Sequence, residues 1–437
     1  MMSSRQSKTK RTKGNEISVR IIYSLLIVLA LPFIAVRLWW RARRQPAYLK
    51  HVGERFGYYG AFQAAAPDAR PLIWLHAVSV GETRAAEPLL RALREKYPSH
   101  RILLTHMTPT GRETGESLFG ADAANRLCCY LPYDYPGAVA RFLDHFQPSV
   151  GILIETEIWP NLVCACKARA TPLYLVNARL SEKSFAGYQR VGKLTTETLR
   201  ALTAIAAQSA DDARRFEALG ATNVSVTGNL KFDVAPSAVQ LALGAQLRES
   251  MGTRRVLLAA STREGEELTI INNKLHEIPN ALLVLVPRHP QRFDDVAMLL
   301  AQHHIVYQRR SANESVRDQT RVLLGDSMGE MVAYYAACDV AFIGGSLLPF
   351  GGQNLIEACA VGKPVLIGPH THNFAQAAES AVATGAALRV MDAADLLRKA
   401  TALLANPKVT GRMSAAALAF SGAHRGATKT LLALIRF

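Results

Sequence analysis

The chain has 437 residues, of which 49% are hydrophobic, so it is long enough for two or three domains and too apolar to be disordered over most of its length. Its formal net charge of +16 at pH 7 would suit a nucleic-acid-binding protein if the basic residues covered a folded surface. Residues 1–50 alone hold eleven Lys and Arg against one Glu, however, and these flank an apolar run, which argues against nucleic-acid binding. None of the six cysteines has zinc-site or Cys-x-x-Cys spacing, so we interpret them as reduced core residues.

The N-terminal segment is predicted to hold the protein at a membrane. Residues 1–20 are predicted to be a disordered basic tail, and residues 21–44 a membrane anchor. Trp39 and Trp40 follow the apolar run 21–36 with arginines behind them, a pattern typical of an interface with anionic lipid. The run has sixteen residues, short of the about 20 that cross a bilayer, so a full span and a half-inserted anchor both remain open. A signal peptide is disfavoured because no small-residue cleavage site is evident.

Short apolar runs and helical patterns alternate along the rest of the chain. Such alternation predicts strand–helix–strand units and parallel sheets that helices cover on both faces. Helices are expected between the strands, for example at residues 83–97 and 211–219. The strands are predicted at residues 72–76, 102–105, 150–154, 173–176 and 204–207, and then at 256–260, 281–286, 320–324, 340–343 and 364–367.

The alternation pauses at residues 234–237, which predicts a domain boundary. The fold class is therefore α/β, with two doubly wound Rossmann-like domains at residues 45–234 and 235–437 behind the N-terminal membrane anchor. Ligands bind doubly wound sheets beyond the carboxyl ends of the strands. Polar or glycine-rich residues that directly follow a strand are thus the candidates for function.

In the first domain, the segment from Ser79 to Glu82 follows the strand 72–76 and opens a helix. One interpretation is a capping box, in which Ser79 caps the helix and Glu82 reaches back to the backbone. The other is catalytic, because a carboxylate at this edge of the sheet could take a proton from a hydroxyl group.

Two more carboxylates, Glu155 and Glu157, end the strand 150–154. Neighbouring carboxylates at a strand end are costly unless they pair with a cation or take part in the chemistry. Lys231 is a possible partner for them. A structural ion pair near the domain boundary remains the alternative interpretation.

In the second domain, residues 344–357 form a glycine-rich turn and a helix start after the strand 340–343. Glycines let the backbone approach a ligand closely, and a helix N-terminus attracts anions. Glu357 lies one turn into that helix, and Arg288 stands between prolines after the strand 281–286, so both suit a nucleotide-sugar site. No Asp-x-Asp pair or telling ligand spacing is present, so we expect no metal ion and no cofactor.

Eight motifs together resemble the 3-deoxy-D-manno-octulosonic acid (Kdo) transferase family over roughly residues 40–435. They are SVGE (79–82), TPTG (108–111), YLPYD (130–134), ETEIWPN (155–161), NARLS (177–181), GNLKFD (228–233), PRHP (287–290) and GGS (344–346). The resemblance implies a GT-B fold and an enzyme that moves Kdo from CMP-Kdo to a hydroxyl of the lipid A precursor (lipid IVA). Attack on the face opposite CMP would invert the anomeric centre. It also implies a place at the inner membrane in lipopolysaccharide biosynthesis, with the catalytic domains on the cytoplasmic side.

The resemblance further implies roles for individual residues. Glu82 would be the general base, and Glu155 and Lys231 would stabilise the transition state. One departure is Leu355, where the family usually has proline after the asparagine. The CMP-binding residues would be Pro287, Arg288, Met328, Gly329, Glu330, Asn354, Leu355, Ile356 and Glu357.

Two other functions remain open on the residues alone. One is a GT-B transferase that uses a UDP-sugar, and the other is a membrane-anchored binding protein without catalytic activity. Retention of Glu82, Lys231, Arg288 and Glu357 argues against the second.

Overall fold

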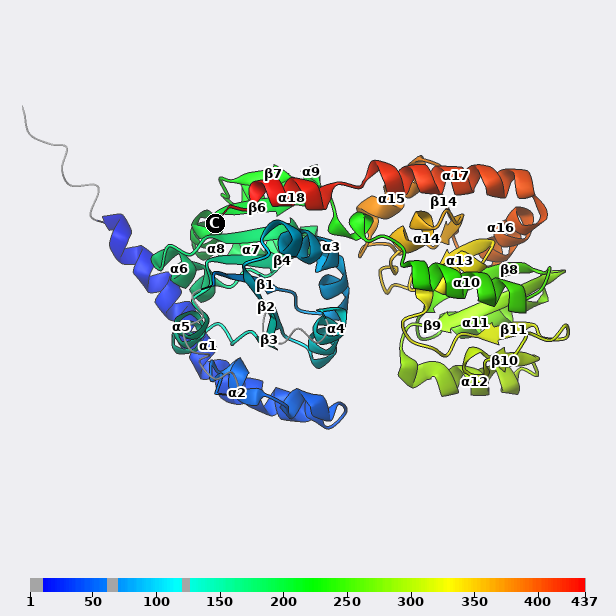
Figure 1. Cartoon of the computed structure of the whole chain (residues 1–437), viewed down its shortest axis with the longest axis horizontal. Helices are drawn as coiled ribbons and strands as arrows, with labels where there is room; N and C mark the ends of the chain where they lie inside the picture. Colours follow the sequence, from blue (N-terminus) through cyan, green and yellow to red (C-terminus); the bar gives the residue numbers. More distant parts are fainter. Residues whose placement is uncertain (1–10, 61–69, 120–125, 437) are drawn as a thin grey trace, which may run out of the picture. The chain divides into compact units, whose positions relative to one another are not determined.

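The computed structural model describes residues 11–60, 70–119 and 126–436, and the chain divides into two compact units (Figure 1). The first unit comprises the chain up to Val234 together with the segment from Gly426 onward. The second unit is Ala235–Arg425.

The first unit is built on a seven-stranded sheet in the order β3-β2-β1-β4-β5-β6-β7, with every described strand pair parallel. Its strands are β1 Leu72–His76, β2 Arg101–His106, β3 Arg126–Tyr130, β4 Val150–Ile154, β5 Leu173–Ala178, β6 Ala204–Ala207 and β7 Val224–Val226. Its helices are α1 Arg11–Ala42, η1 Pro46–Leu49, α2 Val52–Arg55, α3 Val80–Lys96, α4 Pro109–Phe119, α5 Pro136–Phe146, α6 Pro160–Ala168, α7 Glu182–Arg190, α8 Gly192–Ala201, α9 Ala210–Ala218, η2 Leu230–Asp233 and α18 Ala427–Leu434.

The second unit repeats this architecture with a parallel seven-stranded sheet in the order β10-β11-β9-β8-β12-β13-β14. Its strands are β8 Arg255–Thr262, β9 Ala281–Pro287, β10 Tyr307–Arg309, β11 Val322–Leu324, β12 Val340–Ile343, β13 Val365–Ile367 and β14 Ala387–Arg389. Its helices are α10 Ala238–Ser250, α11 Glu266–Asn272, η3 Leu275–Glu277, η4 Pro290–Arg292, α12 Phe293–Gln302, η5 Arg310–Ala312, α13 Met331–Ala337, α14 Ile356–Ala360, α15 Ala375–Ala383, α16 Ala393–Ala405 and α17 Pro407–Ala423.

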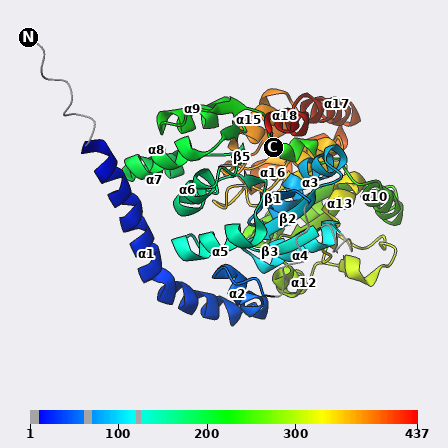
Figure 2. The ribbon, with the colours of Figure 1, turned by 60° about the vertical axis from the view of Figure 1, so that its left-hand side comes forward.

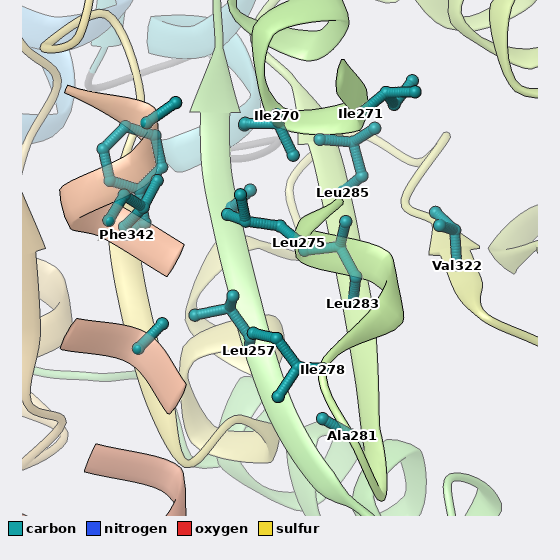
Figure 3. Close-up of a cluster of buried hydrophobic side chains, with 14 of the residues drawn as sticks. Leu257, Ile270, Ile271, Leu275, Ile278, Ala281, Leu283, Leu285, Val322 and Phe342 are labelled. Carbon is teal, nitrogen blue, oxygen red and sulfur yellow. The ribbon is translucent and has the colours of Figure 1, made fainter. Parts of the chain in front are cut away.

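The central strands are buried along their whole length because helices cover both faces of each sheet. All five residues of β1 and of β4 are buried, as are all four of β12. In the second unit, Leu257, Leu283 and Phe342 from three neighbouring strands share one apolar cluster with Leu275 and Ile278 (Figure 3). Strands that bury both faces read as continuous apolar runs, which is why the sequence predicted them.

The C-terminal helix α18 belongs to the first unit, so the predicted second domain, 235–437, extends too far. Asp233 accepts backbone N–H groups of Gly426 and Thr428, both at 2.6 Å, and so caps the start of α18. The buried side chains of Ala427 and Leu431 then join a cluster of the first unit's sheet. This long-range packing gives no local signal in the sequence.

The N-terminal helix begins earlier than expected. Helix α1 starts at Arg11, so the predicted disordered tail, residues 1–20, is wrong for residues 11–20, while residues 1–10 lie outside the described residues. Once a helix has formed, each added residue contributes a hydrogen bond, so the apolar helix extends back into polar sequence. Its segment Val19–Ala42 is long and apolar enough to cross a membrane, with mean hydropathy 2.4. The helix ends at Ala42, so the last two residues of the predicted anchor 21–44 lie beyond it.

Candidate active site

Each sheet has a point where the strand order reverses, and several of the candidate residues follow the strands beside it. The reversal lies between β1 and β4 in the first unit and between β8 and β12 in the second. Loops diverge to opposite faces at such a point and leave a crevice beyond the strand ends. The loops after β1 and β4 carry Glu82 and Glu155, and the loop after β12 begins the glycine-rich segment.

Glu82 stands in the first turn of α3, held by the loop that leaves β1. Its Oε2 accepts the backbone N–H of Val78 at 2.7 Å, and its Oε1 accepts the hydroxyl of Ser79 at 2.9 Å. Ser79 is the N-cap residue, but its side chain makes no capping hydrogen bond. The predicted capping box is therefore not formed, and the contacts instead fix the carboxylate over the β1 end.

Burial raises the pKa of Glu82 to about 7, and the nearby negative charge of Glu155 adds to the effect. The hydrogen bonds from Val78 and Ser79 act in the opposite direction but are outweighed. A carboxylate with a pKa near neutrality can both accept and release a proton at cellular pH. The environment of Glu82 thus suits acid–base chemistry.

The loop between β1 and α3, which carries the hydrogen-bond donors to Glu82, packs closely against the loop between β2 and α4. Met107 donates its backbone N–H to the carbonyl of Val78, and the Thr108 hydroxyl donates to the same carbonyl at 3.1 Å. A Cβ at Gly111 would come within 2.9 Å of that carbonyl oxygen. The TPTG motif therefore fixes the β1–α3 loop by hydrogen bonds. Its last residue must be glycine, because a side chain at Gly111 would collide with the backbone of that loop.

Glu155 and Lys231 form an ion pair, as the sequence suggested. Lys231 Nζ lies 2.8 Å from Glu155 Oε1, and both side chains are 19% exposed. Glu155 has a φ of 64°, the left-handed region that non-glycine residues seldom occupy. Backbone strain of this kind costs about 1–3 kcal/mol and is concentrated at functional sites.

Lys231 is placed by Asn177, a residue that the sequence analysis did not assign to the site. Asn177, at the end of β5, is fully buried and accepts the backbone N–H of Leu230 at 3.0 Å. Asn229 accepts the N–H of Lys231 at 3.0 Å and so closes the η2 turn. The NARLS motif, which begins at Asn177, was the one signal in the sequence. The role of Asn177 becomes visible only in its contact with Leu230, which is far away in the sequence.

Glu157 is the second residue that was left out of the predicted site. Its Oε2 accepts the indole N–H of Trp159 at 2.8 Å and lies 3.9 Å from Nε2 of the buried His76. Burial raises the pKa of Glu157 and lowers the pKa of His76 to about 3, so this imidazole is neutral at pH 7. Three carboxylates of the first unit thus influence one another, because Glu155 and Glu157 both raise the pKa of Glu82.

In the second unit, one buried carboxylate organises the glycine-rich segment. Glu266 is fully buried, and its two oxygens accept the backbone N–H groups of Gly345 at 2.6 Å, Leu347 at 3.0 Å and Arg263 at 2.9 Å. Gly345 has a φ of 68°. Glu266 therefore ties the β8–α11 loop to the loop after β12 across the strand-order reversal. Nothing in the sequence pattern pointed to this residue.

Arg288 is exposed at the end of β9 and joins the same loop. Its Nε donates to Gln353 Oε1 at 3.3 Å, and its backbone N–H donates to Thr262. Gln353 in turn donates its backbone N–H to Gly344. The predicted pair Pro287 and Arg288 is thus brought beside the glycine-rich segment.

Asn354 and Glu357 form the start of α14, where Leu355 stands at the position for which the resemblance implied a proline. Asn354 Nδ2 donates to Glu357 Oε1 at 3.0 Å, and Asn354 Oδ1 accepts the N–H of Ile356 at 3.1 Å. Leu355 is fully buried, and the hydroxyl of Tyr335 donates to the carbonyl of Asn354 at 3.4 Å. Packing and hydrogen bonds therefore fix the turn that proline would otherwise stiffen.

Met328, Gly329 and Glu330 lie after β11 as a separate group. The Glu330 carboxylate pairs with Arg310 at 3.3 Å and accepts the hydroxyl of Ser327 at 2.6 Å. Arg310 belongs to η5, and Ser327 belongs to the same loop as Glu330. Met328 is 61% exposed, and Gly329 has a φ of 81° with open space around it.

Within the described ranges there is no group of three or more His, Cys, Asp or Glu side chains arranged to hold a metal ion. The expectation of a metal-free site stays a prediction.

Comparison with known proteins decides the family. The family model described as 3-Deoxy-D-manno-octulosonic-acid transferase (kdotransferase) matches residues 50–234, and the model for glycosyl transferases group 1 matches residues 301–419. A 3-deoxy-D-manno-octulosonic acid transferase of Bordetella pertussis is 46% identical over 94% of this chain and 98% of its own length. This chain belongs to the Kdo transferase family. A relative of the same name from Haemophilus influenzae is 37% identical over 95% of this chain and 98% of its own length.

This chain is therefore a glycosyltransferase, and its fold is of the GT-B type. A glycosyltransferase from Rickettsia africae has a TM-score of 0.58 at 13% identity over 84% of this chain and 97% of its own. A UDP-GlcNAc 2-epimerase from Neisseria meningitidis has a TM-score of 0.57 at 16% identity over 83% and 98%. At such identities these structures support the fold alone.

Proposed function

We propose that this chain transfers Kdo from CMP-Kdo to a hydroxyl of the lipid A precursor, lipid IVA, with inversion and without a metal ion. The observation that carries the proposal is Glu82, a half-buried carboxylate with a pKa near 7 beside the Glu155–Lys231 pair. The identity of the transferred sugar is inferred from family membership, and the mechanism is inferred from the residues of the site.

The first unit provides the base. Glu82 in its ionised form takes the proton of the acceptor hydroxyl while the hydroxyl oxygen bonds to the anomeric carbon of Kdo and the bond to CMP breaks. Attack from the face opposite CMP inverts the anomeric centre. The ammonium of Lys231, held by Glu155, adds positive charge where negative charge develops.

The second unit provides the donor site. CMP already leaves readily as a phosphate monoester, so the enzyme has mainly to hold it and stabilise its charge. Arg288 and the backbone N–H groups of the glycine-rich segment suit the phosphate. The carboxylates of Glu330 and Glu357 and the amide of Asn354 suit hydroxyl or amino groups of the nucleoside.

Replacing Arg288 with alanine should weaken CMP binding, because hydrogen bonds to charged groups contribute about 1.5–3 kcal/mol. That range corresponds to about 10- to 150-fold in Kd. Titration calorimetry with CMP measures the effect, and Arg398→Ala on α16 is the control because Arg398 is an exposed arginine of the same unit that pairs with Asp395. Equal affinity in the two variants would assign Arg288 to a structural turn.

The membrane is the expected setting because the acceptor is a lipid. CMP-Kdo is a soluble nucleotide sugar, so the catalytic units should face the cytoplasm at the inner membrane. The apolar helix α1 and the arginines around it support membrane association.

Chelation should leave transfer unchanged, because the sequence has no Asp-x-Asp pair suited to a divalent ion and the described residues hold no group of three or more His, Cys, Asp or Glu arranged for one. Initial rates with and without EDTA, measured after the enzyme has been dialysed against chelator, test this. A loss of activity that added magnesium restores would contradict it.

The transfer reaction itself separates the alternatives. Purified enzyme is incubated with lipid IVA and either CMP-Kdo or a UDP-sugar, and the lipid products are weighed by mass spectrometry. Products that gain the mass of one or more Kdo residues, from CMP-Kdo alone, support the proposal. Transfer from the UDP-sugar would favour the other GT-B activity, and no product from either donor would favour a non-catalytic binding protein.

A further inference from the structure

The N-terminal part of α1 is hydrogen-bonded to the interior of the first unit. The Tyr23 hydroxyl donates to Asp134 Oδ2 at 3.0 Å, and the Ser24 hydroxyl donates to Asn161 Oδ1 at 2.9 Å. Asp134 is 3% exposed and also accepts the backbone N–H groups of Asn161 and Leu162 at the start of α6. The only two hydroxyl side chains of the apolar segment Val19–Ala42 thus meet a polar joint of the folded unit.

The C-terminal end of α1 is attached to the same unit. Leu38 and Ala42 are 7% and 6% exposed, and the chain continues directly through η1 into α2. In α2, Arg55 is buried, stacks on Tyr130 with its guanidinium carbon 3.8 Å from the ring centre, and donates to the carbonyl of Met107 at 3.0 Å. Only the short helices η1 and α2 separate the end of α1 from Arg55, and Arg55 is anchored in the core of the first unit. The C-terminal end of α1 is therefore fixed to this unit.

A half-buried stripe connects the two ends. Half-buried residues recur along α1 every three or four positions, which is the spacing of one helix face. Contacts with α6 and α8 lie along this side of α1, which runs past α5, α6 and α8 in both ribbon views (Figures 1 and 2). The half-buried residues of the stripe are Tyr23, Ser24, Ile27, Ala30, Leu31 and Ile34.

The length of the helix makes this docking incompatible with a span. Nineteen residues separate Tyr23 from Ala42, which is about 28 Å along a helix. The hydrocarbon core of a bilayer is about 30 Å thick. If α1 crossed it with Ala42 on the side of the unit, Tyr23 would lie at the opposite leaflet, out of reach of Asp134.

The outward face of α1 is apolar and is bordered by arginines. Two of them stack on tryptophans, with Arg43 4.9 Å from the ring centre of Trp39 and Arg44 5.4 Å from that of Trp40. Tryptophan at the level of the headgroups and arginine against anionic lipid are typical of a helix that lies in an interface. The exposed residues of this face include Ile21, Ile22, Leu25, Leu26, Val28, Leu29, Phe33 and Val36.

We propose that α1 lies in the plane of the membrane, with its polar joint docked on the first unit and its outward apolar face inserted in one leaflet of anionic lipid. The N-terminus and the catalytic units are then on the same side of the bilayer. This inference concerns the membrane contact alone and holds whichever nucleotide sugar the enzyme uses.

The test is the side of the membrane on which each end of the chain lies. Full-length protein carries one cleavable tag before Met1 and another after Phe437, and sealed vesicles of both orientations are prepared from the same cells. Protease added outside should remove both tags in one orientation and neither in the other, with both removed once detergent is added. Removal of only one tag in each orientation would show a span and overturn the proposal.

Variants that break the joint test its role independently of activity. Tyr23→Phe combined with Ser24→Ala should release α1 and move a measurable fraction of the N-terminal tag to the opposite side, because the freed segment is long enough to cross. Leu25→Phe combined with Leu26→Ala changes the neighbouring outward residues and should leave both tags on one side. An unchanged tag position in the first variant would overturn the role given to the two hydrogen bonds.

Discussion

Replacing Glu82 with glutamine should abolish transfer while CMP binding persists. Glutamine keeps the size of the side chain, its carbonyl oxygen can still accept the N–H of Val78, and its amide can donate to the hydroxyl oxygen of Ser79, but it cannot take the acceptor proton. General base catalysis typically contributes about 10²- to 10⁴-fold in rate, so kcat should fall by that order. Initial rates at saturating CMP-Kdo, together with calorimetry for CMP, measure both parts of the prediction.

The purely structural alternative predicts a different pattern. If Glu82 only stabilised the start of α3, its replacement by alanine would cost about 0.5–2 kcal/mol of stability and leave residual activity in the folded fraction. Glu87→Gln is the control on the same helix, because Glu87 pairs only with the exposed Arg91 among the described contacts. Near-normal turnover by Glu82→Gln would remove Glu82 from the mechanism.

Replacing Lys231 with alanine should lower kcat about 10²- to 10³-fold, the loss typical of one group that stabilises developing negative charge. The variant also leaves Glu155 without its partner at a strained backbone position, so stability should fall as well. Urea unfolding followed by fluorescence, alongside initial rates, separates the two effects.

The double variant Lys231→Ala with Glu155→Gln tests whether the pair is structural or catalytic. Removing both charges takes away the unpaired carboxylate, so stability should recover in part. Activity should stay low, because the positive charge is still missing. Recovery of turnover along with stability would show that the pair is only an ion pair of the fold.

The strands that the sequence predicted are the central ones, and the strands it missed are the four at the sheet edges. β1, β4 and β12 bury every residue and therefore read as continuous apolar runs. The edge strands β7, β10 and β14 are three residues long and partly exposed, and β3 carries an arginine at its start. An edge strand packs on one neighbour only, so its sequence is not constrained to be apolar.

The candidate site was predictable where a charged residue directly follows a buried strand. Glu155 and Arg288 stand at strand ends, and Glu82 opens the helix after one. Glu266 and Asn177 were missed because their role depends on hydrogen bonds to loops far away in the sequence. The support that α18 gives to the first unit was missed for the same reason.

The central claim is that the half-buried carboxylate of Glu82 removes the acceptor proton, and the pH dependence of kcat/KM tests it most directly. Burial and the charge of Glu155 raise the pKa of Glu82 to about 7, and only its ionised form is a base, so the rate should fall tenfold per pH unit below about pH 7. In Glu155→Gln the loss of the neighbouring negative charge lowers the pKa of Glu82, so the acid limb of the residual activity should move to lower pH. Glu157→Gln should move it less, because Glu157 contributes less to the shift. A wild-type rate that stays level down to pH 5 would contradict the assignment of Glu82 as the base.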